Sequence, residues 1–98
     1  MGDVTVVWWR DIPAQVLGGR GRDATKVVLS ERFQEAIDTA ATRVGLIGTD
    51  EYLSEWKRET RTVGDDVADA ARALADRIEA EFDDARLNEL AANGGLAS

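Results

Sequence analysis

The chain of 98 residues contains no cysteine and no histidine. Without cysteine there are no disulfides, thiolate nucleophiles, iron–sulfur ligands or cysteine zinc sites. Without histidine the chain lacks the commonest general base and the commonest metal ligand of proteins. An enzyme would have to work through carboxylates, arginine, lysine, serine, threonine or Tyr52. We therefore expect a protein without a cofactor, and an enzyme is the less favoured interpretation.

Long apolar runs are also missing. The longest is Val6–Trp9, which is far shorter than the ~20 residues that a membrane-spanning helix needs. The first residues, MGDVTVV, have neither the basic start nor the apolar stretch of a signal peptide, so we expect a cytoplasmic location and no membrane partner. The length predicts one domain, residues 1–98, with a core of modest size.

Positive charge is scarce in the second half of the chain. Residues 1–48 hold as many basic as acidic side chains, whereas residues 49–98 hold six basic against 13 acidic ones, which accounts for the net charge of −7. Proteins bind the nucleic-acid backbone mainly by neutralising its phosphates, and anionic membranes attract basic segments. The charge therefore argues against nucleic acid and membrane surfaces as partners.

Three short apolar segments near the N-terminus predict a small, mainly antiparallel sheet. Residues 4–9 are β-branched and aromatic on both faces, as in a strand that is covered on two sides. Pro13 ends this segment because it cannot donate to a ladder. Residues 14–17 and 24–29 form the second and third strands, separated by the glycine-rich run Gly18–Asp23.

The remaining sequence predicts three helices, at about 31–44, 50–61 and 65–84, so that the fold class is α+β. Ser30 and Thr49 are suitable N-caps whose hydroxyls accept from the first turn, and Gly45 suits the end of the first helix. Helical spacing predicts that four residues are buried against the sheet: Phe33, Ile37, Val44 and Trp56.

The acidic segment 65–90 is expected to be an addition to this core, followed by a frayed tail at 91–98. On this division a chain that ends at Arg61 should still fold. Its carboxylates, Glu79 and Glu81 among them, are expected to form ordinary solvated helix faces.

Two stretches carry a resemblance to a known family. They are VVWWRDIPAQVLGGRGR and KVVLSERFQEAIDTAATRVGLIGTDEYLSEWKR, and together they cover about residues 4–61. This part resembles the small bacterial domain family called virulence factor, which also occurs at the C-terminal end of conserved virulence factor C type proteins. The family has no assigned molecular function, so the resemblance transfers no catalytic residues. Stand-alone members are found near genes for folate and corrinoid methyl transfer.

The glycine–arginine run offers the clearest candidate binding site. Gly21 provides backbone N–H groups between Arg20 and Arg22, a combination that binds phosphate or carboxylate groups through charge-assisted hydrogen bonds. Trp9 and Arg10 complete the candidate site, because tryptophan is enriched at interface hot spots and Arg10 adds a third positive charge on an otherwise acidic protein. For each feature the structural interpretation is favoured over the binding one: a solvent-exposed hairpin tip for the loop, core packing for Trp8 and Trp9, and a turn-fixing salt bridge for Arg10 and Asp11.

Two functions of different classes follow from these features. The favoured hypothesis is a non-enzymatic interaction or accessory module with an unidentified protein partner. The alternative is binding of a small anionic ligand or cofactor by the glycine–arginine loop, in connection with folate or corrinoid methyl transfer.

Overall fold

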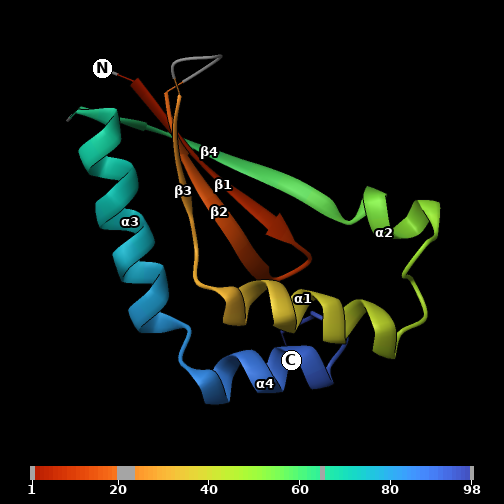
Figure 1. Cartoon of the computed structure of the whole chain (residues 1–98). Coiled ribbons are helices and arrows are strands. Elements are labelled where there is room, and N and C mark those ends of the chain that lie inside the picture. The colour runs from red at the N-terminus through yellow and green to blue at the C-terminus, as the bar shows by residue number, and fades with distance from the viewer. Residues whose placement is uncertain (1, 20–23, 65, 98) are drawn as a thin grey trace.

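A computed structural model describes residues 2–19, 24–64 and 66–97. It is an α+β fold with four strands and four helices in this part of the chain (Figure 1). The predicted class is confirmed, although the sheet has four strands where the sequence predicted three. In chain order the elements are β1 (Gly2–Trp9), β2 (Ile12–Gly18), β3 (Thr25–Val28), α1 (Glu31–Arg43), α2 (Asp50–Ser54), β4 (Trp56–Val63), α3 (Val67–Glu81) and α4 (Asp84–Ala92).

The strands form one antiparallel sheet in the order β3-β2-β1-β4. A two-residue turn joins β1 to β2, with Trp9 opposite Ile12. The register between these strands shifts at Trp8, which faces Pro13, so that Ala14 is an extra residue in β2. A bulge is one of the few places where a sheet tolerates proline, because the ladder is already interrupted there. Pro13 therefore lies within β2 and does not precede it.

Residues 56–63 are the main difference from the sequence prediction. They were expected to continue a helix over 50–61, but α2 ends at Ser54 and the chain continues as β4. Thr49 caps α2 as expected, because its hydroxyl accepts from the Tyr52 N–H at 3.3 Å. All eight residues of β4 pair with β1. Pairing with β1 satisfies the backbone groups of every second β4 residue and the β1 groups that face them, and this outweighs the local helical pattern.

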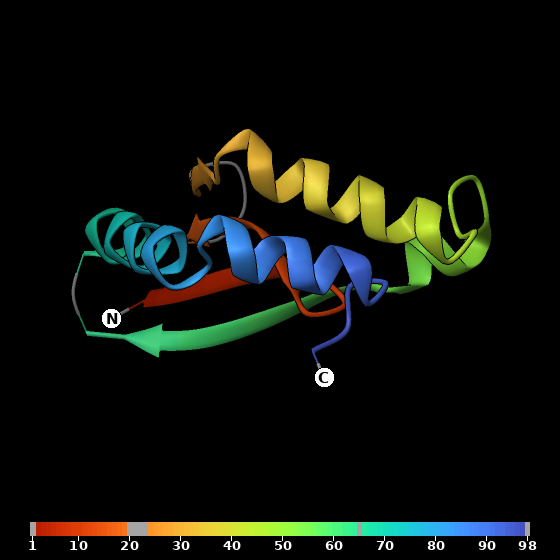
Figure 2. The same cartoon turned by 90° about the horizontal axis from the view of Figure 1, so that it is seen from below.

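The helices cover one face and one end of the sheet. Helix α3 packs along β1, β2 and β3, while α1 and α4 lie side by side, run in the same direction and cross the end of the sheet (Figures 1 and 2). On the opposite face most side chains of the described strands are exposed or half-buried. Within the described residues, none of the helices is long and apolar enough to cross a bilayer.

The predicted helix over residues 65–84 is interrupted. Helix α3 ends at Glu81, and Asp83 starts α4 by accepting a hydrogen bond from the Arg86 N–H at 2.8 Å. The residues after α4, expected to be a frayed tail, also pack: Gly94 and Gly95 are buried. The C-terminal segment therefore returns to the sheet.

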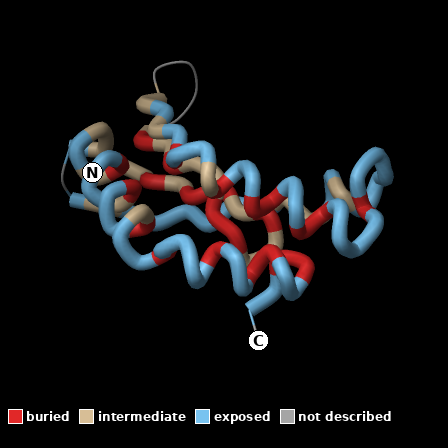
Figure 3. The backbone as a smooth tube through the Cα atoms, turned by 60° about the horizontal axis from the view of Figure 1, so that its bottom comes forward, coloured by how far each residue is buried: buried red, intermediate tan, exposed pale blue. Residues whose placement is uncertain are grey.

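A single apolar core joins the sheet to the helices, as the buried stretches in Figure 3 indicate. Phe33 and Ile37 are buried as predicted. The prediction was wrong for Val44, which is 41% exposed after the end of α1, and Trp56 is only partly buried. Helices α3 and α4, together with Phe82 between them, contribute a large share of the core: Ala71, Ala75, Ile78, Phe82, Leu87, Leu90 and Ala91.

A polar link connects the start of α1 to α3. Ser30 was predicted to cap α1 with its hydroxyl, but its side chain makes no such hydrogen bond. Instead its N–H and hydroxyl donate to the Glu79 carboxylate at 2.7 and 2.8 Å, and Arg32 donates to the same carboxylate at 2.9 Å. Burial alone would raise the pKa of the Glu79 carboxyl, but these hydrogen bonds and the Arg32 charge hold that pKa below its usual value. The Glu79 carboxylate is thus hydrogen-bonded within the fold, and the prediction of an ordinary solvated helix face was wrong for this residue.

Removing residues 64–98 tests whether the C-terminal helices complete the core. A chain that ends at Val63 keeps all four strands and α1, but it loses the residues that cover the sheet and pack on α1. Exposing that apolar surface should leave the truncated chain unfolded, with a random-coil circular dichroism spectrum and no cooperative urea transition. A cooperative transition in the truncated chain would support the division that the sequence predicted.

Candidate functional site

The turn between β1 and β2 is tied to two distant parts of the chain. Arg10 adopts a positive φ of 54°, which is uncommon for a residue other than glycine. Its backbone N–H donates to the Glu55 carbonyl at 3.2 Å and its Nε donates to the Glu55 carboxylate at 2.7 Å. Its Nη1 donates to the Gly94 carbonyl at 3.0 Å. The Arg10 side chain is only 17% exposed, so it acts as a connector inside the fold.

The second turn residue extends the same connection. The Asp11 N–H donates to the Gly95 carbonyl at 2.8 Å, and the Asp11 carboxylate accepts from the Ala97 N–H at 2.7 Å. The same carboxylate lies 3.7 Å from the Lys57 ammonium. The ion pair expected between Arg10 and Asp11 is therefore replaced by separate pairs with Glu55 and Lys57.

Trp9 is completely buried in this region. Its indole N–H donates to the Tyr52 carbonyl at 3.0 Å, and the two rings are 5.7 Å apart. Burial, and then the Asp38 charge, raise the pKa of the Tyr52 hydroxyl above its usual value. Because Trp9 is covered, the structure favours the core interpretation of this residue over contact with a partner.

The described residues stop at Gly19, before the glycine–arginine loop, and resume at Ala24. Arg20, Gly21 and Arg22 lie outside the described residues. Gly19, which precedes them, is at the opposite end of β2 from Arg10. The candidate site of five residues and the anionic-ligand hypothesis for this loop both stay predictions.

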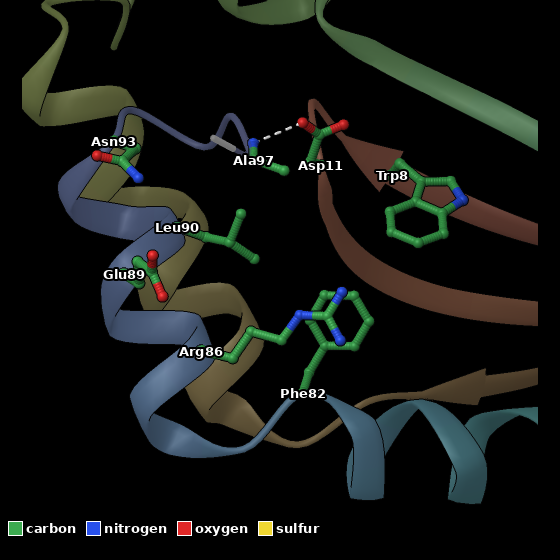
Figure 4. Close-up of a pocket in the computed structure, with 8 residues that line it drawn as sticks. All are labelled: Trp8, Asp11, Phe82, Arg86, Glu89, Leu90, Asn93 and Ala97. Atoms are coloured by element: carbon green, nitrogen blue, oxygen red, sulfur yellow. Dashed lines mark hydrogen bonds between the residues drawn. The ribbon is translucent and has the colours of Figure 1, made fainter.

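Trp8 is more accessible than Trp9 and forms one wall of a recess. We call this hollow of about 390 Å³ the Trp8 recess (Figure 4). It lies between the end of β1, helix α4 and the C-terminal segment. In the close-up, Leu90 and Arg86 project from α4 toward the centre, and the Asp11 to Ala97 hydrogen bond closes one end. Its lining consists of Trp8, Asp11, Phe82, Arg86, Glu89, Leu90, Asn93 and Ala97.

A second hollow, of about 450 Å³, adjoins the recess on the side of β4. Trp8 and Asp11 line both hollows, and the second one is completed by Lys57, Arg58 and Glu59. Trp8 is paired directly with Lys57 in the sheet. The Trp8 side chain therefore lies between helix α4 on one side and an exposed strand on the other.

The chemistry of the recess is aromatic and charged. The Trp8 and Phe82 rings meet edge to face with centroids 6.2 Å apart, and the Arg86 guanidinium lies 4.1 Å from the Phe82 ring centroid. Such stacking holds an arginine in place, and Arg86 Nη1 also donates to the Glu81 carbonyl at 3.4 Å. The Glu89 carboxylate adds negative charge on the same helix. The described residues thus offer an apolar floor with polar groups of both signs at the rim.

Comparison with known proteins identifies the family. The model of the family described as virulence factor matches residues 7–91, which is most of the chain. The chain belongs to the virulence factor family. No curated protein and no solved structure matched. The match to this virulence factor domain continues beyond Arg61 through α3 and most of α4, so the C-terminal helices lie within the family region.

Sequence reasoning missed most of the residues that line the Trp8 recess and the adjoining hollow, which we together call the candidate surface. Lys57 and Arg58 were assigned to a helix, and Arg86 and Leu90 were assigned to an appendage. The tryptophan pair was the available signal, since adjacent strand residues point to opposite faces and need not be covered equally. What the sequence did not reveal was which tryptophan stays accessible.

Two alanine substitutions test the packing of the C-terminal segment on Trp9. Gly95 has a φ of +90°, and an added Cβ would lie 2.7 Å from the Trp9 ring. Gly48 has a φ of +80°, and an added Cβ would meet nothing within 4 Å. Gly48→Ala should lower the free energy of unfolding by about 1–2 kcal/mol, through backbone conformation alone. Gly95→Ala should lower it by a further ~1–3 kcal/mol, because the Cβ overpacks a buried ring.

Urea denaturation of both variants provides the measurement. Equal losses of unfolding free energy in the two variants would mean that residues 94–97 are not packed against Trp9.

Proposed function

We propose that this virulence factor domain is a non-enzymatic protein-interaction module, and that its partner binds at the Trp8 recess and the adjoining strand β4. The observation that supports this most is the exposure of β4. Six consecutive residues, 57–62, are exposed, and among the described strands β4 pairs with β1 alone. An edge strand of this length normally needs protection or a partner.

The composition of the surface fits an interface. Tryptophan and arginine are the residues most enriched among those that contribute strongly to binding energy. Trp8, Arg86 and Arg58 lie on this side of the molecule, around two adjoining hollows. An apolar centre with a charged rim is the usual arrangement of a protein interface.

The residues of the Trp8 recess suit the binding of another protein better than catalysis. Arg86 is stacked on Phe82, and the Asp11 carboxylate is already engaged by Ala97 and Lys57. No metal-binding group of three or more acidic side chains occurs in the described ranges. A role in holding or positioning another protein uses these residues as they stand, whereas catalysis needs convergent groups with perturbed pKa values.

Site-specific photo-cross-linking in cells of the source organism tests the proposal. A photoreactive phenylalanine analogue replaces Arg58 in one protein and Arg77 in a control, since both arginines are exposed but Arg77 lies on α3. Position 58 should give discrete adducts with one protein, identified by mass spectrometry, and position 77 should not. The same adducts from both positions, or none from position 58, would contradict the proposed surface.

A further inference from the structure

The hydrogen-bonding direction of β4 follows from two bonds at its neighbour β1. The Gly19 N–H donates to the Asp3 carbonyl at 2.8 Å, so the backbone N–H and carbonyl groups of Asp3 point to β2. The Arg10 N–H donates to the Glu55 carbonyl, so Arg10 directs its backbone toward the β4 side. Backbone groups alternate in direction along a strand. The backbone N–H and carbonyl groups of the even-numbered β1 residues therefore point to β4.

The register then identifies the free backbone groups. Val4, Val6 and Trp8 of β1 are paired with residues 61, 59 and 57 of β4, so the N–H groups of those three partners point to β1. The N–H and carbonyl groups of Arg58, Thr60 and Thr62 point away from the sheet. These groups form a regular row with the spacing that another strand requires.

The charge on β4 is opposite to that of the whole chain. The strand carries Lys57, Arg58 and Arg61 against Glu59, while the chain has a net charge of −7. Glu59 is engaged by Arg61 at 2.6 Å, and Lys57 is 3.7 Å from the Asp11 carboxylate. Arg58 has no ion pair with any of the described residues. A local positive strip on an acidic protein favours acidic partners over neutral or basic ones.

The position of Trp8 adds a requirement for the partner. Trp8 shares one face of the sheet with every second residue of β1. The β4 residues paired with them are Lys57, Glu59 and Arg61, so their side chains lie on the same face as Trp8. A strand added along β4 would direct every second side chain to this face, and one of them would lie beside the two hollows that Trp8 lines. The Trp8 recess, of about 390 Å³ and lined by Trp8, Phe82 and Leu90, has the volume for a large apolar side chain.

From these observations we infer that β4 takes up an extended acidic segment of a partner protein as a fifth strand, with one apolar side chain of that segment in the Trp8 recess. This inference rests on the proposed function and names the class of partner. A second copy of the chain is less suited to the edge, because it would bring the same three cations against each other. Charged residues on an edge strand also discourage indiscriminate pairing, which makes the edge selective for acidic strands.

A proline substitution and a matched alanine substitution at Thr60 separate strand addition from other kinds of contact. Thr60→Pro removes an outward N–H without removing a donor to β1, whereas Thr60→Ala keeps the N–H and removes the same hydroxyl. Proline is tolerated on edge strands when its nitrogen faces solvent. The probe is a displayed library of random 12-residue peptides, selected on the unmodified protein, from which the most enriched peptide is synthesised.

Three results are expected. The enriched sequences should be rich in Asp, Glu and β-branched residues and contain a large apolar residue. The synthetic peptide should bind Thr60→Pro at least 10-fold more weakly than Thr60→Ala, and its affinity should fall as salt is raised. Enrichment without an acidic bias, or equal binding by the two variants, would overturn the inference. If adducts still form at position 58 in that case, the interaction surface stands and only strand addition is excluded.

Amide hydrogen exchange on the unmodified protein gives a test that does not depend on folding of the proline variant. Saturating peptide should slow exchange at least 10-fold at Arg58, Thr60 and Thr62, while the amides of residues 57, 59 and 61 are already slow in the free protein. Unchanged exchange at the outward amides would overturn the inference. So would slow exchange there in a free protein that light scattering shows to be a dimer, because a second copy would then occupy the edge.

Discussion

The contact between Arg10 and Glu55 is the constraint on which the arrangement of the chain depends. It joins the β1–β2 turn to the residue that precedes β4, and Arg10 also reaches the Gly94 carbonyl in the C-terminal segment. Three segments that are far apart in sequence therefore meet at one guanidinium group. Arginine suits this position, since its planar group offers several donors in fixed directions. The positive φ of Arg10 is tolerated because these partners hold the turn.

The candidate surface follows from this junction. Fixing Glu55 fixes the start of β4, so that Trp56 pairs with Trp9 and the exposed strand extends along β1. Fixing Gly94 brings the C-terminal segment over Trp9 and places Ala97 beside Asp11, which closes one end of the Trp8 recess. The two tryptophans acquire different roles as a result. Trp9 is sealed in the core and Trp8 remains partly accessible between α4 and β4.

Local patterns predicted the elements that local physics determines. Helix α1 has a regular apolar stripe, and Gly45 ends it with a positive φ as expected. Strand β1 was evident from its β-branched and aromatic residues. Strand β4 was not, because an exposed edge strand lacks apolar alternation, and the spacing of Tyr52 and Trp56 imitated one helix face. Its identity depends on pairing with β1, from 47 residues (Trp9 and Trp56) to 61 residues (Gly2 and Val63) earlier in the chain.

The candidate site was harder to predict than the fold, for a related reason. Arg10 looks like a surface residue next to a turn, and only its contacts with Glu55 and Gly94 place it inside the fold. Such contacts join residues 43 or more positions apart, and no local pattern in the sequence records them. The break between α3 and α4 was partly visible, since Asp83 has the side chain of an N-cap.

A double-mutant cycle on Arg10 and Glu55 tests the central role of this contact most directly. The unfolding free energies of Arg10→Ala, Glu55→Ala and the double variant give the coupling between the two side chains, and the exposed pair Arg61 and Glu59 provides a control of similar geometry. We expect a coupling of about 1.5–3 kcal/mol for the partly buried pair and at most about 0.5 kcal/mol for the exposed one. Equal coupling in the two cycles would contradict the account, because the Arg10 contact would then be an ordinary surface ion pair.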